Sequence, residues 1–478
     1  MNLRMACGLQ RKEIKTMNEN EQPTKFETDL IKGSVAKKLL LFAIPFIISN
    51  LVQSLYAVAD MIIVGQFNGA ASMSGVNIGS NVSFLMTNMI FGLCVGATVL
   101  IGQYLGNGDR KKLNDTIATL FTLLIFAAVI LSALMLIFRK PLLDLIQTPP
   151  ESYDEAMIYL VVTTIGTIFI FGYNAFAAVM RGMGDSKTPL IFVSIACVLS
   201  FIGDLILVGI FKTGAAGASI STVISQALSM ILCIIYFKRH NFVFDFKLKS
   251  FRVHKESLKM ILKIGIPTSV QNVITSISFI IMIAMVNSLG VTASAAVGAV
   301  GKFNSFAILP AIAISSSIAA MSAQNIGAGE YGRAKKTMKT GLVIAVCMSM
   351  VMFVIAQLFP GAILRIFGDD EGVIREGIVY LRTFSFDYIF APIMFAFNGL
   401  FIGSGHTMFS LLNNMSSAIL IRVPVAYIFG MVFGWKLLGI GLGGPFASGM
   451  ALVICIIYYF TGKWRKAVII KREEEVII

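Results

Sequence analysis

Long apolar runs constrain this chain more than any other feature. A run of about 20 apolar residues marks a helix that crosses a bilayer, because hydrocarbon tolerates only a backbone that satisfies its own hydrogen bonds. Twelve such runs are predicted, at 39–64, 77–104, 117–138, 157–180, 189–210, 215–237, 261–288, 297–323, 341–360, 382–402, 409–433 and 438–461. Only 13% of the residues are charged, whereas soluble domains carry roughly a quarter. We therefore expect an all-α membrane protein with twelve transmembrane helices.

The positive charge is spread unevenly over the connections between these runs. Of the 39 Lys and Arg residues, 30 lie in the two termini and the even-numbered connections, and seven lie in the odd-numbered connections. This asymmetry is typical of the positive-inside rule and predicts that both termini are cytoplasmic. The net charge of +14 therefore orients the chain in a membrane, and we expect no nucleic-acid partner.

An internal repeat organises the sequence. The segment "LLLFAIPFIISNLV" at 39–52 aligns with "MILKIGIPTSVQNVI" at 260–274, and "GQYLGNGDRKK" at 102–112 aligns with "AQNIGAGEYGRAKK" at 323–336. A third pair is "FAAVMRGMGDS" at 176–186 and "FNGLFIGSGHT" at 397–407, and the offset is 221 or 222 throughout. Two six-helix halves with the same orientation are thus expected, an organisation typical of secondary transporters.

The repeat divides the chain into five expected parts. These are an N-terminal tail (1–38), a first lobe (39–237), a basic linker (238–260), a second lobe (261–461) and a C-terminal tail (462–478). The linker mixes Phe with Lys and Arg. This composition fits either an amphipathic helix on the membrane surface or a solvated connection.

Polar residues inside the first lobe form a pattern. Gln53, Tyr56 and Asp60 are spaced three and four apart, so they share one helix face. Asp204 is the only charge of the span 189–210. A carboxylate in hydrocarbon costs several kcal/mol unless it is paired, hydrated or protonated, which makes both Asp residues candidates for a functional site. The alternative is a structural role in hydrogen bonds between helices.

The second lobe lacks this carboxylate pair. Met282 is the counterpart of Asp60, so ion coupling is expected in the first lobe. Lys302 and Arg422 are charges inside predicted spans, and either binds an anionic group or partners a carboxylate such as Asp387; Lys302 also lies near enough to a helix end to extend to the interface. Asp387 is either an acidic site of the tenth helix or a solvent-exposed residue near its outer end.

Several segments resemble one transporter family. They are "AIPFIISNLVQSLYAVADMIIVGQ", "GQYLGNGD", "MRGMGDSKTP", "LILVGIFKTGAAGASISTVISQ" and their second-half counterparts. Over about residues 35–462 the sequence resembles the multidrug and toxic compound extrusion (MATE) family, in particular its DinF-like and MepA-like branch. The resemblance implies a V-shaped, monomeric antiporter of a bacterial-type cell (inner) membrane. Such a protein exports organic cations and drugs, including antibiotics, in exchange for protons or sodium ions, and needs no cofactor.

The resemblance also implies site residues. The expected cation- or proton-binding residues are Asp60, Asn174, Asp204, Thr222 and Ser200. Related members carry Asn where this chain has Ser200, and the loss of that amide oxygen favours protons over sodium. The expected substrate-binding residues are Gln53, Tyr56, Asp60, Met282 and Asp387. Desolvation and a neighbouring carboxylate both favour the protonated form of a carboxyl group, so a proton and a cationic substrate would compete for one site.

Two other functional classes fit parts of the sequence less well. The string "GMGD" at 182–185 occurs in intramembrane aspartyl proteases, but it falls in a predicted loop, and the repeat replaces Asp185 with His406. A flippase for lipid-linked saccharides belongs to the same wider superfamily. Such proteins usually have extra helices and basic cavities, whereas twelve spans and an acidic site are predicted here. We therefore expect a transporter and not an enzyme.

Overall fold

The computed structural model describes residues 26–240, 242–466 and 468–470, and these residues fold into helices joined by short connections. The described part of the chain contains no β-strand. Residues 1–25 and 471–478, which belong to the two expected tails, lie outside the described residues.

The first half of the chain contains six spans. The helices are α2 (Val35–Asn107), α3 (Arg110–Leu145), α4 (Pro150–Ile165), α5 (Thr167–Gly182), α6 (Lys187–Asp204) with the π-helix η1 (Leu205–Ile210), and α7 (Gly214–Arg239). The long α2 is two spans, because it breaks at Gly69, whose φ of 83° is accessible to glycine at little cost. α4 and α5 are separated by a bend of 53° and together form one broken span.

The second half repeats this organisation. Its helices are α8 (Lys255–Asn287), α9 (Val291–Ala307), α10 (Leu309–Gly327), α11 (Tyr331–Leu358), α12 (Pro360–Arg365), α13 (Glu371–Phe384), α14 (Asp387–Gly403), α15 (Thr407–Ser416), η3 (Ser417–Arg422), α16 (Val423–Tyr427), η4 (Ile428–Val432) and α17 (Lys436–Phe460). Short 3-10 helices, η2 (Leu248–Ser250) and η5 (Lys463–Arg465), lie outside the spans.

The number of spans agrees with the prediction from the apolar runs. Among the described residues, nine helices are long and apolar enough to cross a membrane, and the two bent pairs raise the number to 11. The break of α2 at Gly69 brings it to twelve. The chain is thus an all-α membrane protein with two six-helix halves, as expected.

The turn between α2 and α3 shows why the "GNGD" motif ends one span and begins the next. Gly108 has a left-handed φ of 76°, and its N–H returns to the carbonyls of Tyr104 and Leu105, which terminates α2. The Asp109 carboxylate then accepts the Lys112 N–H at 3.0 Å, which caps the start of α3.

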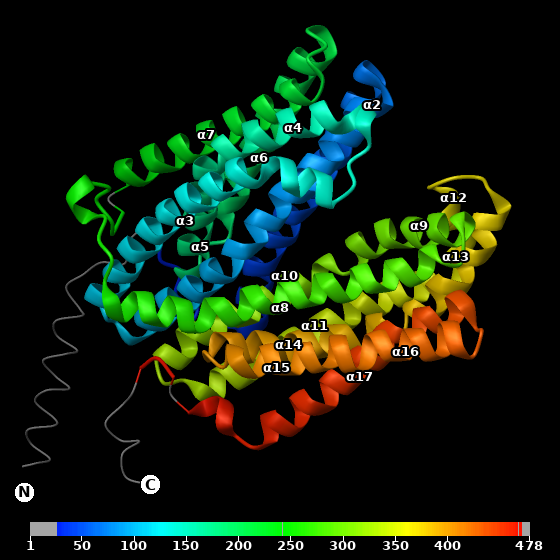
Figure 1. Ribbon diagram of the computed structural model, residues 1–478. Coiled ribbons are helices and arrows are strands. Elements are labelled where there is room, and N and C mark those ends of the chain that lie inside the picture. Colours follow the sequence, from blue (N-terminus) through cyan, green and yellow to red (C-terminus); the bar gives the residue numbers. More distant parts are fainter. Residues whose placement is uncertain (1–25, 241, 467, 471–478) are drawn as a thin grey trace, which may run out of the picture.

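The two helix bundles converge at one end of the molecule and diverge at the other (Figure 1). At the convergent end, Gln103 of α2 donates to the Gly403 carbonyl at 2.9 Å, and Gln324 of α10 donates to the Gly182 carbonyl at 3.3 Å. Both glutamines are buried. Gln103 and Gln324 are repeat counterparts, and so are Gly182 and Gly403, so the same contact is made twice. We call this region the closed end.

Two glycines allow the close approach of the lobes at the closed end. A Cβ on Gly106 would lie 2.0 Å from the Gln324 carbonyl oxygen, and a Cβ on Gly327 would lie 2.1 Å from the Gln103 carbonyl oxygen. Gly106 and Gly327 are also repeat counterparts. Any larger side chain at either position therefore requires a movement of the facing backbone.

Residues 26–34 form a strap across the closed end. The Thr28 N–H donates to the Met183 carbonyl in the first lobe at 3.1 Å, and the Leu30 N–H donates to Gln324 Oε1 in the second lobe at 3.2 Å. Arg333 donates to carbonyls of the strap, including that of Gly33 at 2.9 Å. Phe26 is buried against Phe237, with ring centroids 5.1 Å apart. The strap thus contacts both lobes.

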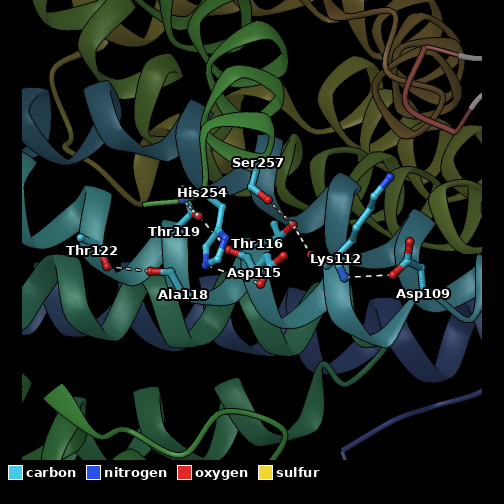
Figure 2. A network of polar contacts seen from close by, with 9 residues as sticks. All are labelled: Asp109, Lys112, Asp115, Thr116, Ala118, Thr119, Thr122, His254 and Ser257. Atoms are coloured by element: carbon cyan, nitrogen blue, oxygen red, sulfur yellow. Dashed lines mark hydrogen bonds and ion pairs between the residues drawn. The ribbon is translucent and has the colours of Figure 1, made fainter. Parts of the chain in front are cut away.

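The basic linker does not form the amphipathic helix that its composition allowed. Between the end of α7 at Arg239 and the start of α8 at Lys255, its described residues contain only the short η2, and its Phe242 and Phe244 are buried among aromatic residues of the first lobe. Figure 2 shows how the end of the linker is fixed to α3. There the His254 N–H donates to Thr119 Oγ1 at 3.0 Å, and His254 Nε2 lies 3.5 Å from an Asp115 carboxylate oxygen. In this linker, burial of the aromatic side chains against the first lobe therefore takes precedence over their contact with the membrane surface.

Candidate functional site

Tyr56 joins three helices of the first lobe through its hydroxyl group. The Tyr56 Oη lies 2.6 Å from Ser200 Oγ, 3.2 Å from Thr222 Oγ1 and 3.2 Å from Asp204 Oδ2. Tyr56 comes from α2, Ser200 and Asp204 from α6, and Thr222 from α7. The helical spacing of four between Ser200 and Asp204 places both side chains on one face of α6. The structure therefore brings four of the predicted residues together.

Asp60 lies one helical turn beyond Tyr56 and completes this cluster. Asp60 and Asp204 are buried, with 6% and 0% of their surface exposed, and their carboxyl groups lie within hydrogen-bonding reach of each other. One oxygen of each carboxyl group is buried without a hydrogen-bond partner among the described residues. We call Tyr56, Asp60, Ser200, Asp204 and Thr222 the carboxyl site.

Two further polar residues belong to the same cluster and were not predicted from the sequence. Ser221 lies close to the Asp204 carboxyl group and donates to the Ser200 carbonyl at 2.7 Å. Tyr159 of α4 is buried, interacts electrostatically with both carboxyl groups and lies close to Thr222. Ser221 is adjacent to Thr222 in the chain, which was a usable signal. Tyr159 lies in a different predicted span, so only the packing of α4 reveals it.

Two predicted residues have their hydrogen bonds elsewhere. The Gln53 side chain is exposed and donates to the Ser49 carbonyl of its own helix at 3.2 Å. The Asn174 amide donates to the Ile170 carbonyl of its own helix at 2.8 Å. A shared helix face brought Tyr56 and Asp60 to the cluster but left Gln53 outside it, because α2 faces α6 and α7 only along part of its length. A role for Asn174 at the carboxyl site stays a prediction.

A cavity of about 840 Å³ lies between the two lobes. This volume is in the range of pockets that hold drug-sized ligands, about 300–1,000 Å³. Most of its lining belongs to the second lobe, including Met282 and Asp387, and first-lobe residues such as Phe46 and Arg181 also contribute. Gln53, Tyr56 and Asp60 do not line it. Of the predicted substrate-binding residues, the structure thus places Met282 and Asp387 at the cavity and Tyr56 and Asp60 at the carboxyl site, and it places Gln53 at neither.

Asp387 and Arg422 lie on the second-lobe wall of this cavity. Asp387 is buried, with 6% exposed, so the solvent-exposed alternative is wrong. It lies close to Ser448 and interacts electrostatically with Arg422. Arg422 donates to Ser278 Oγ at 3.0 Å and lies over the Phe279 ring at 4.5 Å. Lys302, in contrast, is exposed and is not part of the cavity wall.

The comparisons with known proteins agree with the repeat and the fold. A family model described as MatE matches residues 45–206 and 267–428, two segments that correspond at the repeat offset. The "Probable multidrug resistance protein YpnP" of Bacillus subtilis is 29% identical over 437 residues, which cover 91% of this chain and 97% of that protein. The "Probable multidrug resistance protein NorM" of Thermotoga maritima is 27% identical over 451 residues, covering 92% and 95%.

A solved structure shares the architecture. It is titled as the outward-facing conformation of a multidrug resistance MATE family transporter of the MOP superfamily. The TM-score is 0.87 at 21% sequence identity, with 94% of this chain and 100% of that chain covered. At this identity the likeness concerns the fold: twelve transmembrane helices in two halves.

Proposed function

The chain belongs to the MATE family of transporters, and from this premise we propose that it is a proton-coupled antiporter that exports organic cations and drugs. Family membership makes it a transporter and not an enzyme, which removes the protease alternative. The coupling ion, the substrates, the bacterial inner-membrane location, the cytoplasmic termini and the monomeric state belong to the proposal.

The carboxyl site is the observation that carries the proposal. Two ionised carboxylates are both acceptors, so two carboxyl groups within hydrogen-bonding reach of each other need a proton between them. The surrounding oxygens of Tyr56, Ser200 and Thr222 come from hydroxyl groups, which both donate and accept. This arrangement supports proton binding. A sodium ion would instead need several oxygens directed at one point, and it remains the second candidate.

The exchange of a proton for a cationic substrate follows from the separation of the carboxyl site from the cavity. Protonation of the Asp60–Asp204 pair removes negative charge from the interior of the first lobe and allows its helices to pack differently. We infer that a cationic substrate in the cavity is favoured while the pair is ionised and is released when the pair takes up a proton. Competition through charge is sufficient for antiport and needs no direct contact between proton and drug.

The closed end supports alternating access. The two reciprocal glutamine contacts and the strap hold the lobes together there, while the bundles diverge at the opposite end (Figure 1). We propose that the lobes, residues 39–237 and 261–461, rock as units about the cavity. Opening toward the cytoplasm would then require that both glutamine contacts break together.

Replacement of Asp60 by Asn tests the coupling. Asn keeps the size and hydrogen-bonding capacity of the side chain but cannot ionise. We expect Asp60→Asn to reach the membrane and to lose uphill efflux of a fluorescent organic cation under an imposed pH gradient. Asp154→Asn, which removes an exposed carboxylate from the same lobe, is the matched control and should export normally.

Two outcomes would contradict the proposal. Gradient-driven efflux by Asp60→Asn at the parent's rate would remove Asp60 from the mechanism. Efflux in the parent that follows an imposed sodium gradient and ignores pH would keep the site but assign it to sodium.

A further inference from the structure

The carboxyl site lies nearer to the divergent end of the first lobe than to the closed end. Thr222 follows the start of α7 at Gly214, and Asp60 precedes the break of α2 at Gly69. At a rise of 1.5 Å per residue, both side chains are about 12–14 Å inside the divergent end, whereas Asp60 is about 38 Å from the start of α2. The divergent end is the outer one under the positive-inside assignment. A proton from the outer solution therefore has about two helical turns to cross.

Along α4, Glu155 lies between this outer end and the carboxyl site. It is one helical turn before Tyr159, so the two side chains share one face of α4. Two glycines of α2 pack against that face. A Cβ on Gly75 would lie 2.5 Å from Glu155 Cβ, and a Cβ on Gly79 would lie 2.6 Å from Tyr159 Cδ1. Glu155 is partly exposed and Tyr159 is buried, so α4 carries a carboxylate toward the solvent and a hydroxyl group toward the carboxyl site.

A chain of hydroxyl groups continues from Tyr159 to the carboxyl pair. Tyr159 lies close to Thr222. The Thr222 Oγ1 lies 3.2 Å from the Tyr56 Oη, and the Tyr56 Oη lies 3.2 Å from an Asp204 carboxylate oxygen. A hydroxyl group both accepts and donates, so it can take up a proton on one side while it gives up its own on the other.

Glu155 keeps one carboxylate oxygen available for a proton. Its Oε2 accepts the Ala215 N–H at 2.7 Å, at the start of α7. No ion pair of at most 4.0 Å joins Glu155 to a Lys, Arg or His within the described part of the chain. The α2 segment at this end contributes no ionisable side chain, and those of the neighbouring helix ends and connections are Arg139, Lys140, Asp144, Glu151, Tyr153, Asp154 and Lys212.

The second lobe contains the same pair of residues without the carboxyl site. Glu376 and Tyr380 of α13 correspond to Glu155 and Tyr159 at the repeat offset of 221. Met282 stands in the place of Asp60, so the second lobe has the carboxylate and the tyrosine but no carboxyl pair for them to serve.

We propose that Glu155 is the proton-entry residue of the first lobe. It takes up a proton from the outer solution and gives it to the Tyr159 hydroxyl, directly or through one bridging water. The hydroxyls of Tyr159, Thr222 and Tyr56 each accept one proton and pass one on, and the Asp204 carboxylate receives the last. One O–H bond breaks at Glu155 and one forms at Asp204, and the hydroxyl groups end as they began. This inference rests on the proposed proton coupling and names the path that supplies it.

Two substitutions separate proton delivery from the hydrogen bond to α7. Glu155→Gln keeps an acceptor for the Ala215 N–H but has no acid, whereas Glu155→Asp keeps the acid and is one methylene shorter. We expect Glu155→Gln to lower efflux of a fluorescent organic cation at least about tenfold, because positioned acids and bases contribute about 100- to 10,000-fold. The assay uses proteoliposomes that hold the dye inside and face an acidic outer solution. Glu155→Asp should keep at least about half of the parent's rate but melt at a lower temperature, because the bond to Ala215 is weakened.

Dependence on buffer provides a readout that a purely structural role would not change. At constant pH, a higher concentration of an impermeant buffer in the outer solution should restore part of the rate in Glu155→Gln and leave the parent unchanged. The reason is that the acid form of the buffer replaces the missing donor. Glu376→Gln is the matched control and should transport at the parent's rate. Each variant should bind the dye with an affinity within about twofold of the parent's.

The crossed variants also show what would overturn the inference. The parent's rate in Glu155→Gln, at any buffer concentration, would exclude Glu155 from proton entry. Loss of efflux in Glu155→Asp at normal abundance would assign Glu155 to the start of α7 instead, and this result is informative even if Glu155→Gln does not fold. An equal defect in Glu376→Gln would sever the link to the carboxyl site. Failure of the proposed function has a different signature, namely no pH-driven efflux in the parent.

Discussion

The close packing at the closed end predicts that a single added methyl group changes the conformation of the protein. In Gly106→Ala the new Cβ would lie 2.0 Å from the Gln324 carbonyl oxygen, and real Cβ atoms essentially never approach closer than 3.0 Å. The facing backbone of α10 must therefore move by at least 1 Å. The clash is with backbone and not with the end of a flexible side chain, so the lobes themselves have to separate. We expect Gly106→Ala to shift the protein toward the conformation that is open at this end.

The size of the shift follows from the contacts that are lost. A separation of 1 Å stretches the Gln103–Gly403 hydrogen bond from 2.9 Å beyond the 3.5 Å limit, and the Gln324–Gly182 bond of 3.3 Å with it. A buried polar group left unsatisfied costs about 1–3 kcal/mol. Even about 2 kcal/mol for the two glutamines together changes the ratio of conformations about 30-fold.

Spin labels at the opposite end measure this change. Leu145 and Ile366 are highly exposed, with 79% and 78% of their surface accessible, and they lie in different lobes. In a cysteine-free background, labels at these positions should move closer together in Gly106→Ala. Gly332→Ala is the matched control, because a Cβ there has no neighbour within 4 Å. Gly327→Ala should reproduce the effect, and the double variant should add little, since one separation relieves both clashes. An unchanged distance distribution in Gly106→Ala would refute this reasoning.

Two further predictions concern single side chains. Tyr56→Phe removes the hydroxyl that joins Ser200, Asp204 and Thr222, so proton-driven export should fall about 10- to 100-fold. The control Tyr427→Phe, at an exposed position, should export normally. An unchanged export rate in Tyr56→Phe would contradict the role of the hydroxyl. His406, in the loop between α14 and α15, has its pKa lowered from the ordinary 6.5 by burial, so the unfolded chain binds the proton more readily and the melting temperature should fall as the pH drops below 6.5. The same decline in His406→Gln would show that another group is responsible.

The fold was predictable because its cause is local. The apolar runs set the spans, and the repeat set their division into halves. The break of α2 at Gly69 was harder to predict. Gly69 lies between two predicted spans, and the sequence around it does not show that the helix continues on both sides. The π-helices η1, η3 and η4 were not predictable, because their sequences are as apolar as the flanking α-helices. Their geometry depends on the packing of neighbouring helices.

The candidate site was predictable only where charge or spacing marked it. Asp60 and Asp204 stand out as charges in apolar sequence, and Tyr56 shares a face with Asp60. Tyr159 lies on another helix and carries no such signal, so only the fold places it beside Thr222. Gln53 has the correct spacing, but its side chain bonds to its own helix outside the cluster. The burial of Asp387 depends on the cavity between the lobes, and no single segment of the sequence encodes that cavity.

The reciprocal contact at the closed end has the form of an isologous dimer interface within one chain. In a symmetric dimer every contact occurs twice, and both copies must change together. Here duplication within a single sequence lets the two copies differ. Gln103 contacts the opposite lobe alone, whereas Gln324 also accepts the Leu30 N–H of the strap. We therefore expect the closed end to open in an all-or-none manner. Because the strap bonds to Gln324 and not to Gln103, a change in the strap is expected to bias this opening through one half of the interface.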